Sequence, residues 1–442
     1  MDANLYISSP GILNRERALL VLRNAMQLRL LGGAQEVGRS AIMLKDERSI
    51  MLDFGVKIDH HTEYPIALPK MDALVISHAH LDHSGFTAAI YNDMSIPAFG
   101  TMPTMDLSAL LLDDALNIAK KQHSKTFFHK RQIRSMISKY VSLDYHTQAR
   151  LGGFDISLYD AGHISGSSIT LVEKPHSKGN KRVVYTGDFK MREQTLHKGA
   201  EVVKSDVLIM ESTYATKDHP DRNKVIKEMI DKIKETLDNG GNALVPVFAV
   251  GRSQEILAIL YENGLTPSTY IDGMARKATS IVMNHPRFIK NREVLENAIS
   301  ETTWIEERGA RKEALNGPSI IVTTAGMLNG GPVLDYITRL NNNSHIFLTG
   351  YQVEGTNGKM LIDHGYIMLD GEKTKITTPV SFHDLSAHAD RADLHRYAKE
   401  SSPNTVVCVH GSEDNAKALA NDLSDEGFTA VAPKVGDTIN ID

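Results

Sequence analysis

The chain has 442 residues, of which 41% are hydrophobic and 23% are charged, and its formal net charge at pH 7 is −5. This length exceeds one ordinary hydrophobic core, so we expect two or three domains. No apolar run approaches the length of a membrane-spanning helix, and the single cysteine, Cys408, excludes an intrachain disulfide framework and fits a reducing cytoplasm. The negative net charge means that a polyanionic partner would need local basic patches or bound metals.

The N-terminal segment predicts one helix and three short strands. Residues 1–26 carry acids and bases among short apolar patches, which indicates an added helix rather than a secretory signal. The strands follow, separated by Gly32-Gly33 and by a charged turn, at residues 27–31, 40–44 and 49–52. Asp53 ends the third strand, where it is equally a turn residue or a carboxylate that orients metal ligands.

A histidine-rich loop comes next. An apolar run at residues 73–76 predicts a strand that leads directly into Ser-His-Ala-His-Leu-Asp-His-Ser-Gly. Imidazole and carboxylate groups together are typical ligands for zinc or manganese. His78 and His80 are two positions apart in an extended segment, so their rings lie on one side, and the following turn brings Asp82 and His83 to a neighbouring point. Because one metal rarely takes four ligands from one loop, we expect two metals to share it.

Helical runs near residues 85–91 and 105–119 lead into a basic stretch. Between Ala115 and Leu143 the sequence has no acid, although it has seven lysines and arginines: Lys120, Lys121, Lys125, Lys130, Arg131, Arg134 and Lys139. Histidines and phenylalanines alternate with these cations. The stretch is either a solvated basic helix face or a nucleic-acid contact, and the sequence does not favour the contact.

Two further metal ligands are predicted after the strands that resume at residues 154–159. Small residues surround His163, which lets the backbone approach something compact. A strand at residues 183–185 then ends in Thr-Gly-Asp, which again places a carboxylate, Asp188, after a strand and beside a glycine. A carboxylate can bridge two metals with its two oxygens and a neutral imidazole cannot, so Asp188 is the expected bridge.

From Glu211, which ends a strand at residues 207–210, helices and strands alternate. The predicted helices are residues 223–238, 252–261, 274–283 and 333–340, and the predicted strands are residues 243–247, 269–271, 319–323 and 346–348. This alternation predicts a mostly parallel sheet that binds ligands beyond the C-terminal ends of its strands. A glycine-rich loop at residues 324–332 enters one helix and is either an anion site or only a tight turn.

Histidines return in the last segment, in which His388 precedes a predicted strand at residues 405–409 that ends at His410. The elements expected to finish the chain are a helix and then a hairpin, at residues 414–423 and 429–441. Asp188 and His410 are separated by 221 residues that include the alternating section. We therefore expect a second domain to be inserted into the first, with the chain returning to complete the metal site.

These residues resemble the motifs of a known group of enzymes. A set in the right order resembles the ligand motifs of the metallo-β-lactamase superfamily, with Asp53 as the carboxylate that precedes them: His78, His80, Asp82, His83, His163 and Asp188. Glu211, His388 and His410 resemble the three additional motifs of the β-CASP nucleases. The sequences around Glu211 and His388 are closer to the cleavage-and-polyadenylation-specificity-factor branch, which processes messenger RNA 3′ ends, than to the RNase J branch.

The resemblance implies an α/β fold in which a parallel-sheet β-CASP domain is inserted into an αββα metallo-β-lactamase sandwich. The expected parts are an N-terminal helical extension, the first part of the sandwich, the inserted domain and the last part of the sandwich: residues 1–26, 27–210, 211–385 and 386–442. We expect neither a preceding pair of KH domains nor a long C-terminal extension, so targeting or dimerisation through such additions is in doubt. A homodimer is left open.

The resemblance also implies a ribonuclease that hydrolyses single-stranded RNA with two zinc ions, or with manganese. His78, His80 and His163 would hold one metal, Asp82, His83 and His410 the other, and Asp188 would bridge them. The expected catalytic residues are Asp53, Asp82, Glu211 and His388. Of these, His388 would be paired with Glu211 and would either hold the scissile phosphate or protonate the leaving group.

The expected contacts to RNA are Ser165, Arg252, Gly326, Asn329, Gly330 and Tyr351. Endonucleolytic cleavage and 5′-to-3′ exonucleolytic trimming share this chemistry, and both stay open. The alternative functions are a DNA nuclease of the same superfamily and a non-catalytic RNA-binding subunit, which the complete ligand set disfavours. A small-molecule hydrolase on the same core would need no large inserted domain. The expected location is the cytoplasm.

Overall fold

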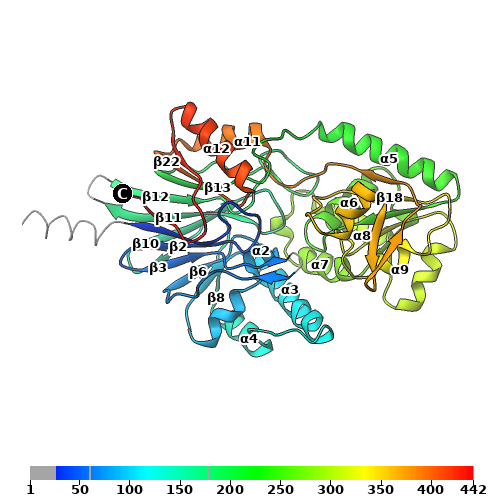
Figure 1. Cartoon of the computed structure of the whole chain (residues 1–442), viewed down its shortest axis with the longest axis horizontal. Helices are drawn as coiled ribbons and strands as arrows, with labels where there is room; N and C mark the ends of the chain where they lie inside the picture. Colours follow the sequence, from blue (N-terminus) through cyan, green and yellow to red (C-terminus); the bar gives the residue numbers. More distant parts are fainter. Residues whose placement is uncertain (1–25, 59–60, 177–178, 442) are drawn as a thin grey trace, which may run out of the picture.

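The computed structural model describes residues 26–58, 61–176 and 179–441, and within them the chain forms two lobes (Figure 1). Over the same residues, the first lobe contains two seven-stranded sheets and the second contains a six-stranded sheet. Of the helical extension predicted for residues 1–26, residues 1–25 lie outside the described residues. None of the described helices is both long and apolar enough to cross a membrane.

The two large sheets of the first lobe pack face to face. The first has the order β24 (Thr438–Asn440), β1 (Gln27–Gly32), β2 (Ala41–Lys45), β3 (Ser49–Leu52), β6 (Ala73–Val75), β7 (Ala98–Gly100) and β8 (Tyr140–Ser142). The second has the order β23 (Thr429–Val431), β22 (Thr405–Val409), β13 (Val207–Glu211), β12 (Gly179–Tyr185), β11 (Ser168–His176), β10 (Phe154–Asp160) and β9 (Gln148–Leu151). Alternate apolar side chains, such as Leu28 and Ile42 from one sheet and Ile156 and Val183 from the other, form the core between them.

Helices cover the two outer faces of this sandwich. The first sheet is covered by the 3₁₀ helix η1 (Thr87–Asn92), α3 (Met102–Lys121) and α4 (Lys130–Ser138). The second sheet is covered by α11 (Arg391–Ser401) and α12 (Glu413–Asp425). The resulting order of layers is helix, sheet, sheet, helix, which confirms the predicted αββα sandwich.

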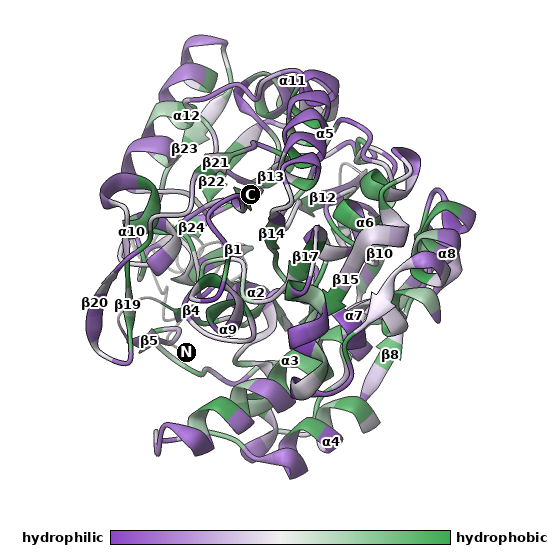
Figure 2. Ribbon diagram, turned by 90° about the vertical axis from the view of Figure 1, so that its right-hand side faces the viewer, coloured by the Kyte–Doolittle hydropathy of each residue, from purple (hydrophilic) through white to green (hydrophobic). Residues whose placement is uncertain are grey.

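The second lobe is built on a parallel sheet, as the alternation of helices and strands predicts. Its order is β16 (Thr303–Trp304), β15 (Thr269–Asp272), β17 (Ser319–Thr323), β14 (Asn242–Pro246), β18 (His345–Leu348) and β21 (Val380–Phe382), and neighbouring strands are parallel. The α-helices of this lobe are α5 (Arg222–Asp238), α6 (Arg252–Glu262), α7 (Met274–Met283), α8 (Arg292–Glu301), α9 (Val333–Ile337) and α10 (Asn357–His364). Figure 2 shows the apolar strands β14, β15 and β17 inside and the more hydrophilic helix α5 outside.

Short elements complete the two lobes. The first lobe adds α2 (Leu81–Ser84) and the ribbon β4 (Lys57–Ile58) with β5 (Thr62–Glu63). The second adds η2 (Thr266–Ser268), η3 (Pro286–Phe288), η4 (Arg308–Leu315) and the hairpin of β19 (Tyr366–Leu369) and β20 (Glu372–Lys375).

The chain leaves the second sheet of the sandwich after β13 to form the second lobe. It rejoins that sheet at β22. These two strands are neighbours in the second sheet and pair in parallel, with Val207 opposite Thr405 and Glu211 opposite Val409. Residues far apart in the sequence are therefore brought to one strand end. The boundaries of the inserted domain, residues 211–385, stay a prediction.

One of the predicted elements is wrong. The final segment is not a hairpin, because β23 pairs with β22 in the second sheet whereas β24 pairs with β1 in the first. Two strands that are neighbours in the sequence pair with each other when neither finds another partner. Here each of the two sheets has an open edge strand, β22 in one and β1 in the other, and these edges bind β23 and β24 separately. The helical run predicted near residues 85–91 is present as the 3₁₀ helix η1, which follows the short α2.

A buried carboxylate joins the two lobes. Glu255 on α6 accepts the backbone N–H groups of Thr195 (2.6 Å) and Leu196 (3.0 Å) from the first lobe and is paired with Arg222. Leu196 inserts into the core of the second lobe. Burial by itself raises the pKa of Glu255, but Arg222 and these hydrogen bonds outweigh burial and lower it, so the carboxylate stays charged.

We expect Glu255→Ala to lower the unfolding temperature by about 10 °C, because it leaves buried backbone donors and the half-buried Arg222 without their acceptor. Thermal unfolding followed by circular dichroism measures this change. Glu262→Ala, at the other end of the same helix, is the matched control and should leave the unfolding temperature nearly unchanged. Equal unfolding temperatures for both variants would show that Glu255 does not hold the lobes together.

Candidate metal centre

The residues predicted to carry the chemistry lie at one rim of the sandwich. The parallel strands β12, β13 and β22 end at this rim, and loops from the first sheet meet them there. The residues are His78 and His80 after β6, Asp82 and His83 in α2, His163 between β10 and β11, Asp188 after β12, Glu211 at the end of β13, His388 before α11 and His410 after β22.

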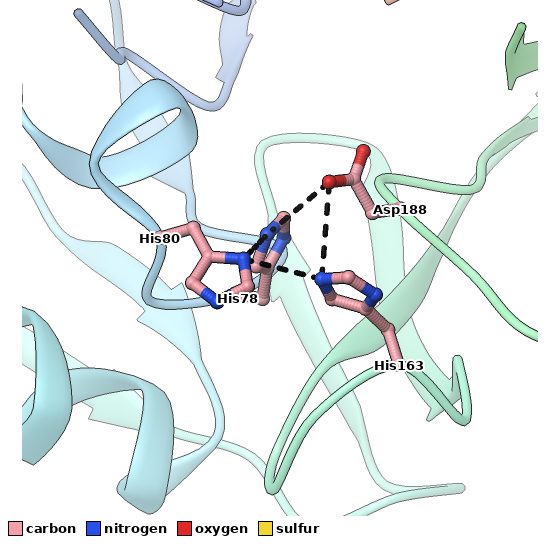
Figure 3. Close-up of side chains that lie close together, drawn as sticks. All are labelled: His78, His80, His163 and Asp188. Carbon is pink, nitrogen blue, oxygen red and sulfur yellow. Dashed lines mark hydrogen bonds and ion pairs between the residues drawn. The ribbon is translucent and has the colours of Figure 1, made fainter. Parts of the chain in front are cut away.

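A first donor group consists of His78, His80, His163 and Asp188 (Figure 3). The Nδ1 atom of His80 lies 3.2 Å from Nε2 of His78 and 3.2 Å from Nε2 of His163. The Oδ2 atom of Asp188 lies 3.5 Å from Nε2 of His78 and 3.9 Å from Nε2 of His163. All four side chains point toward one small volume.

A second donor group consists of Asp82, His83, His410 and again Asp188. The Nε2 atoms of His83 and His410 lie 3.2 Å apart, and Oδ2 of Asp82 lies 3.3 Å from Nε2 of His410. The Oδ1 atom of Asp188 lies 3.3 Å from Nε2 of His83. Asp188 therefore turns one oxygen to each group, as a bridging carboxylate must.

These separations fit metal ions of the zinc type. A tetrahedral zinc with ligands at about 2.0 to 2.1 Å separates its ligand atoms by about 3.3 Å. The shortest separations in the two groups are 3.2 and 3.3 Å. The buried Oδ1 atom of Asp188 makes no hydrogen bond of adequate geometry within the described residues. A set of converging nitrogen and oxygen donors without such partners is what a metal site requires.

The second nitrogen of His78, His80, His83 and His163 lies next to an oxygen outside the donor groups, which leaves the other nitrogen to face its group. His410 differs, because its Nδ1 lies 3.2 Å from Asp188 Oδ1 as well as near Thr213. Nδ1 of His78 lies 3.0 Å from Ser77 Oγ, and Nδ1 of His163 lies 2.9 Å from the carbonyl of Ala387. The remaining pairs are His80 Nε2 with the carbonyl of Val250 (3.4 Å), His83 Nδ1 with Asp53 Oδ2 (2.7 Å) and His410 Nδ1 with Thr213 Oγ1 (3.4 Å). Such outer contacts set the tautomer and orientation of metal-binding histidines.

Burial tunes the charges of these groups. It lowers the pKa of His78, His80 and His163, so their imidazoles are neutral, as ligands must be. Burial by itself raises the pKa of Asp188, but the surrounding histidines, His410 and His83 first, hold it well below its usual value. Asp188 is therefore a carboxylate, the form that binds cations.

Asp53 is the buried anchor of the site. Its Oδ2 accepts hydrogen bonds from His83 Nδ1 (2.7 Å), Ser77 Oγ (2.6 Å) and the hydroxyl of Tyr185 (2.8 Å), and its Oδ1 accepts the N–H of Ser77 (2.7 Å). Asp53 and His410 both have positive φ angles, 58° and 48°. This left-handed backbone is rare for residues other than glycine and clusters at functional sites. Asp53 contacts the histidines from behind rather than joining the donor groups.

His388 and Glu211 form a pair beside the first donor group. Nδ1 of His388 lies 3.0 Å from Glu211 Oε2 and 3.9 Å from Asp188 Oδ2. Burial opposes charge on this imidazole, but Glu211 and then Asp188 outweigh burial and raise its pKa to about 9. Lys190 donates from Nζ to the carbonyl of His388 (2.9 Å), which fixes the loop. Within the described residues, Nε2 of His388 has no hydrogen-bond partner.

Three of the predicted RNA contacts lie near the centre. Arg252, at the start of α6, is buried, and its Nε and Nη1 find no hydrogen-bond partner within the described residues. Burial, helped by Arg222, lowers the pKa of Arg252 to about 10. Ser165, near His163 in the sequence, also has a buried Oγ without a partner. Tyr351 is 45% exposed, and its ring lies 6.0 Å from that of Tyr214, which is 6.1 Å from the ring of His388.

The glycine-rich loop fits an anion site less well. Asn329 Oδ1 accepts the N–H of Asn357 at the start of α10 (2.8 Å), so this side chain supports the fold. The carbonyl of Gly330 accepts the N–H of Ala325 inside the loop (3.2 Å). A Cβ added to Gly326 would meet the backbone of Phe248 at 2.9 Å, so glycine serves close packing there. Helix α9, which follows, has only five residues.

Several residues of the site are missing from the sequence-based prediction. Ser77 and Tyr185 bind Asp53, Thr213 contacts His410, and Lys190 holds the loop of His388. Ser77 precedes the first histidine and Tyr185 ends the strand before Asp188, so adjacency to a ligand was an available signal. The contact between Lys190 and His388 spans residues far apart in the chain and left no signal.

The chain matches three known domain families and is similar over most of its length to proteins named as RNases. Residues 42–215 match the metallo-beta-lactamase superfamily domain, residues 253–361 the Beta-Casp domain and residues 376–433 the Zn-dependent metallo-hydrolase RNA specificity domain. The protein named probable RNase MJ4 from Methanocaldococcus jannaschii is 38% identical over 94% of this chain and 100% of its own length. RNase aCSPSF2 from Saccharolobus solfataricus is 34% identical over 94% of this chain and 85% of its own length.

Two further comparisons are more distant. A protein named transcription termination factor FttA from Methanothermobacter thermautotrophicus is 34% identical over 89% of this chain and 68% of its own length. A crystal structure of a protein of unknown function from Enterococcus faecalis superposes with a TM-score of 0.60 at 14% identity, over 94% of this chain and 99% of its own. The latter likeness supports the fold alone.

We expect Asp53→Asn to weaken metal binding by about 10- to 100-fold, because the neutral side chain holds His83 less firmly. Metal content after dialysis against a graded series of chelator concentrations measures this loss. Asp72→Asn is the matched control, since Asp72 pairs with Arg48 at the surface. If the two variants retain metal equally, Asp53 does not position a ligand. An unchanged circular dichroism spectrum verifies that Asp53→Asn is folded.

Proposed function

Because this chain belongs to the β-CASP family of the metallo-β-lactamase superfamily, we propose that it is a ribonuclease that hydrolyses phosphodiester bonds of single-stranded RNA with two metal ions. The observation that carries the proposal is the pair of buried donor groups that share Asp188. The relatives named as RNases, and the match of residues 376–433 to an RNA specificity domain, support RNA as the substrate.

The proposed ligands of the two metals follow the two donor groups. His78, His80 and His163 would hold one, Asp82, His83 and His410 the other, and Asp188 both. The nitrogen-rich donor set favours zinc, with manganese as the second choice. When bound, these ions supply Lewis acidity, which makes water nucleophilic near neutral pH and neutralises negative charge on a phosphate. Asp53 and Ser77 hold the histidines in orientation.

His388 is the proposed contact to the reacting phosphate. Glu211 binds Nδ1, which also lies 3.9 Å from Asp188 Oδ2, so Nε2 is the nitrogen left to donate to a substrate. From there the imidazole either holds a phosphoryl oxygen or passes its proton to the leaving oxygen, and both roles need the same geometry. Glu211 also accepts the N–H of Phe189 (2.9 Å), which ties this pair to the loop of Asp188.

Arg252 is the proposed substrate clamp. A buried guanidinium without partners on two of its nitrogens is costly unless a ligand supplies them, and a phosphate does so with paired oxygens. The carbonyl of Val250, two residues earlier, lies 3.4 Å from His80, so the start of α6 adjoins the first donor group. Tyr351 offers an exposed ring on which a base can stack.

The cytoplasm is the proposed place of action, since Cys408 is buried and the chain has no second cysteine for an intrachain disulfide. A non-catalytic RNA-binding subunit is disfavoured, because such a subunit has no need of two complete donor groups.

The first experiment uses one RNA labelled in turn at its 5′ and 3′ ends, with zinc or manganese added. Internal fragments from both labels would identify an endonuclease, and mononucleotides from the 5′ end alone would identify a 5′-to-3′ exonuclease. We expect His80→Ala to reduce cleavage by about a hundredfold or more, because it removes a metal ligand. His146→Ala, at an exposed histidine, is the control. Cleavage by His80→Ala at the wild-type rate would refute the metal assignment.

We expect Arg252→Gln to raise KM on RNA by about tenfold or more while changing kcat less, because the clamp binds substrate and transition state alike. Steady-state kinetics on a fluorescent RNA measure both constants. Arg339→Gln, at an exposed arginine after α9, controls for the loss of one positive charge. An unchanged KM for Arg252→Gln would remove Arg252 from the substrate site.

A further inference from the structure

A basic surface lies on the first lobe around the end of α3 and along α4. We call the following residues the α3–α4 basic surface, and all of them are exposed: Lys120, Lys121, Lys125, Arg131, Arg134 and Lys139. Helix α4 turns Ile133 and Met136 inward onto the core beneath the first sheet, so its outward side carries the charges. Phe127 is 41% exposed between them, and Lys125 Nζ lies 5.0 Å from the centre of its ring.

None of these six cations forms a close ion pair in the described residues, although burial raises the pKa of Asp114 and Lys121 is near enough to that carboxyl group to oppose the rise. Throughout the described residues, no carboxylate lies within 4.0 Å of any of them, whereas the neighbouring Lys130 pairs with Asp113 at 2.7 Å. On α5, by contrast, Lys227 and Lys232 pair with acids of their own helix. The whole chain is negatively charged, so an unpaired positive surface is a local exception.

Helix stability does not explain this arrangement. Lys120 and Lys121 lie in the last turn of α3, where the helix dipole favours cations. The first turn of α4, however, carries Lys130 and Arg131 and no acid, although the dipole disfavours cations there. Lys130 is compensated by Asp113, but Arg131 stands against the dipole without an ion pair in the described residues, and a ligand explains its place better than folding does.

The surface is connected to the metal centre by one helix. The N-cap of α3, Thr101, donates from Oγ1 to the carbonyl of Gly166 (2.7 Å), in the loop that carries His163. Helix α3 has 20 residues, so it spans about 30 Å from that loop to the basic surface. Figure 1 shows α3 running from the junction of the lobes toward α4. A ligand that reaches both places must be long and flexible.

We propose that the α3–α4 basic surface binds the sugar-phosphate backbone of single-stranded RNA outside the metal centre. This inference rests on the proposed function, because it names the path of the same substrate. Unpaired cations suit a phosphate chain, and the exposed ring of Phe127 suits a base, which is the combination found where proteins bind single strands without sequence preference.

The test compares two variants that each remove four positive charges. Lys125→Gln, Arg131→Gln, Arg134→Gln and Lys139→Gln are combined in one protein, and Lys224→Gln, Lys227→Gln, Lys232→Gln and Lys234→Gln on α5 form the control. Figures 1 and 2 place α5 and α4 at opposite sides of the molecule. Affinity for a long single-stranded RNA is measured against salt concentration, with His80→Ala added so that the RNA stays intact.

We expect the first variant to bind RNA about tenfold or more weakly, with a salt slope that is shallower by about 3, or about 0.7 for each phosphate that is no longer bound. The control should bind as the parent protein does. With His80 restored, both variants should cleave a short oligonucleotide at the wild-type rate. Failure of the wild-type protein to cleave it would refute the proposed ribonuclease and leave the binding result to be judged separately.

Three outcomes would overturn the proposed surface. The first is an unchanged affinity and salt slope in the α4 variant. The second is an equal loss of affinity in the α5 control, which would show a general effect of net charge. The third is competition by polyglutamate at the same charge concentration as RNA, which would identify an acidic protein as the partner instead.

Discussion

Between β13 and β22 the chain leaves the sandwich, builds a second lobe and returns to pair in parallel, with Glu211 opposite Val409. The candidate centre depends on this pairing, because it brings His410 next to the strand end that carries Glu211 and opposite the histidine loop. His410 then faces His83 and Asp82, while Glu211 faces His388. If the strands paired one position out of register, the side chains would turn to the other face of the sheet, and neither arrangement would form.

The second constraint is electrostatic. Several imidazoles converge within 3 to 4 Å of one another around one carboxylate, in a buried place. Protonation of all of them would set like charges side by side, and burial already lowers the pKa of His78, His80 and His163. Asp188 offsets part of this cost by turning one oxygen to each group. In each group the remaining imidazole nitrogens and carboxylate oxygens face a common point, and a cation can occupy that point.

The two lobes act together at the candidate centre. The second lobe supplies the carbonyl of Val250 behind His80 and the buried guanidinium of Arg252, while Glu255, one turn further along α6, holds the lobes in register. One helix therefore contacts both the junction of the two lobes and the candidate metal centre. On the other side of the candidate metal centre, α3 leads from the loop of His163 to the α3–α4 basic surface.

The sequence by itself determined the chemistry and the broad architecture. Ligands such as His78, His80 and Asp188 follow strands at recognisable spacings, and the alternation of helices and strands after Glu211 predicted the parallel sheet, because both signals are local. The pairing partners of distant segments were decided only by the tertiary structure. It separated β23 from β24 and turned Asn329 toward α10. It also gave Asp53 its four hydrogen-bond donors. These choices depend on which groups packing brings within hydrogen-bond distance, and no spacing along the chain records them.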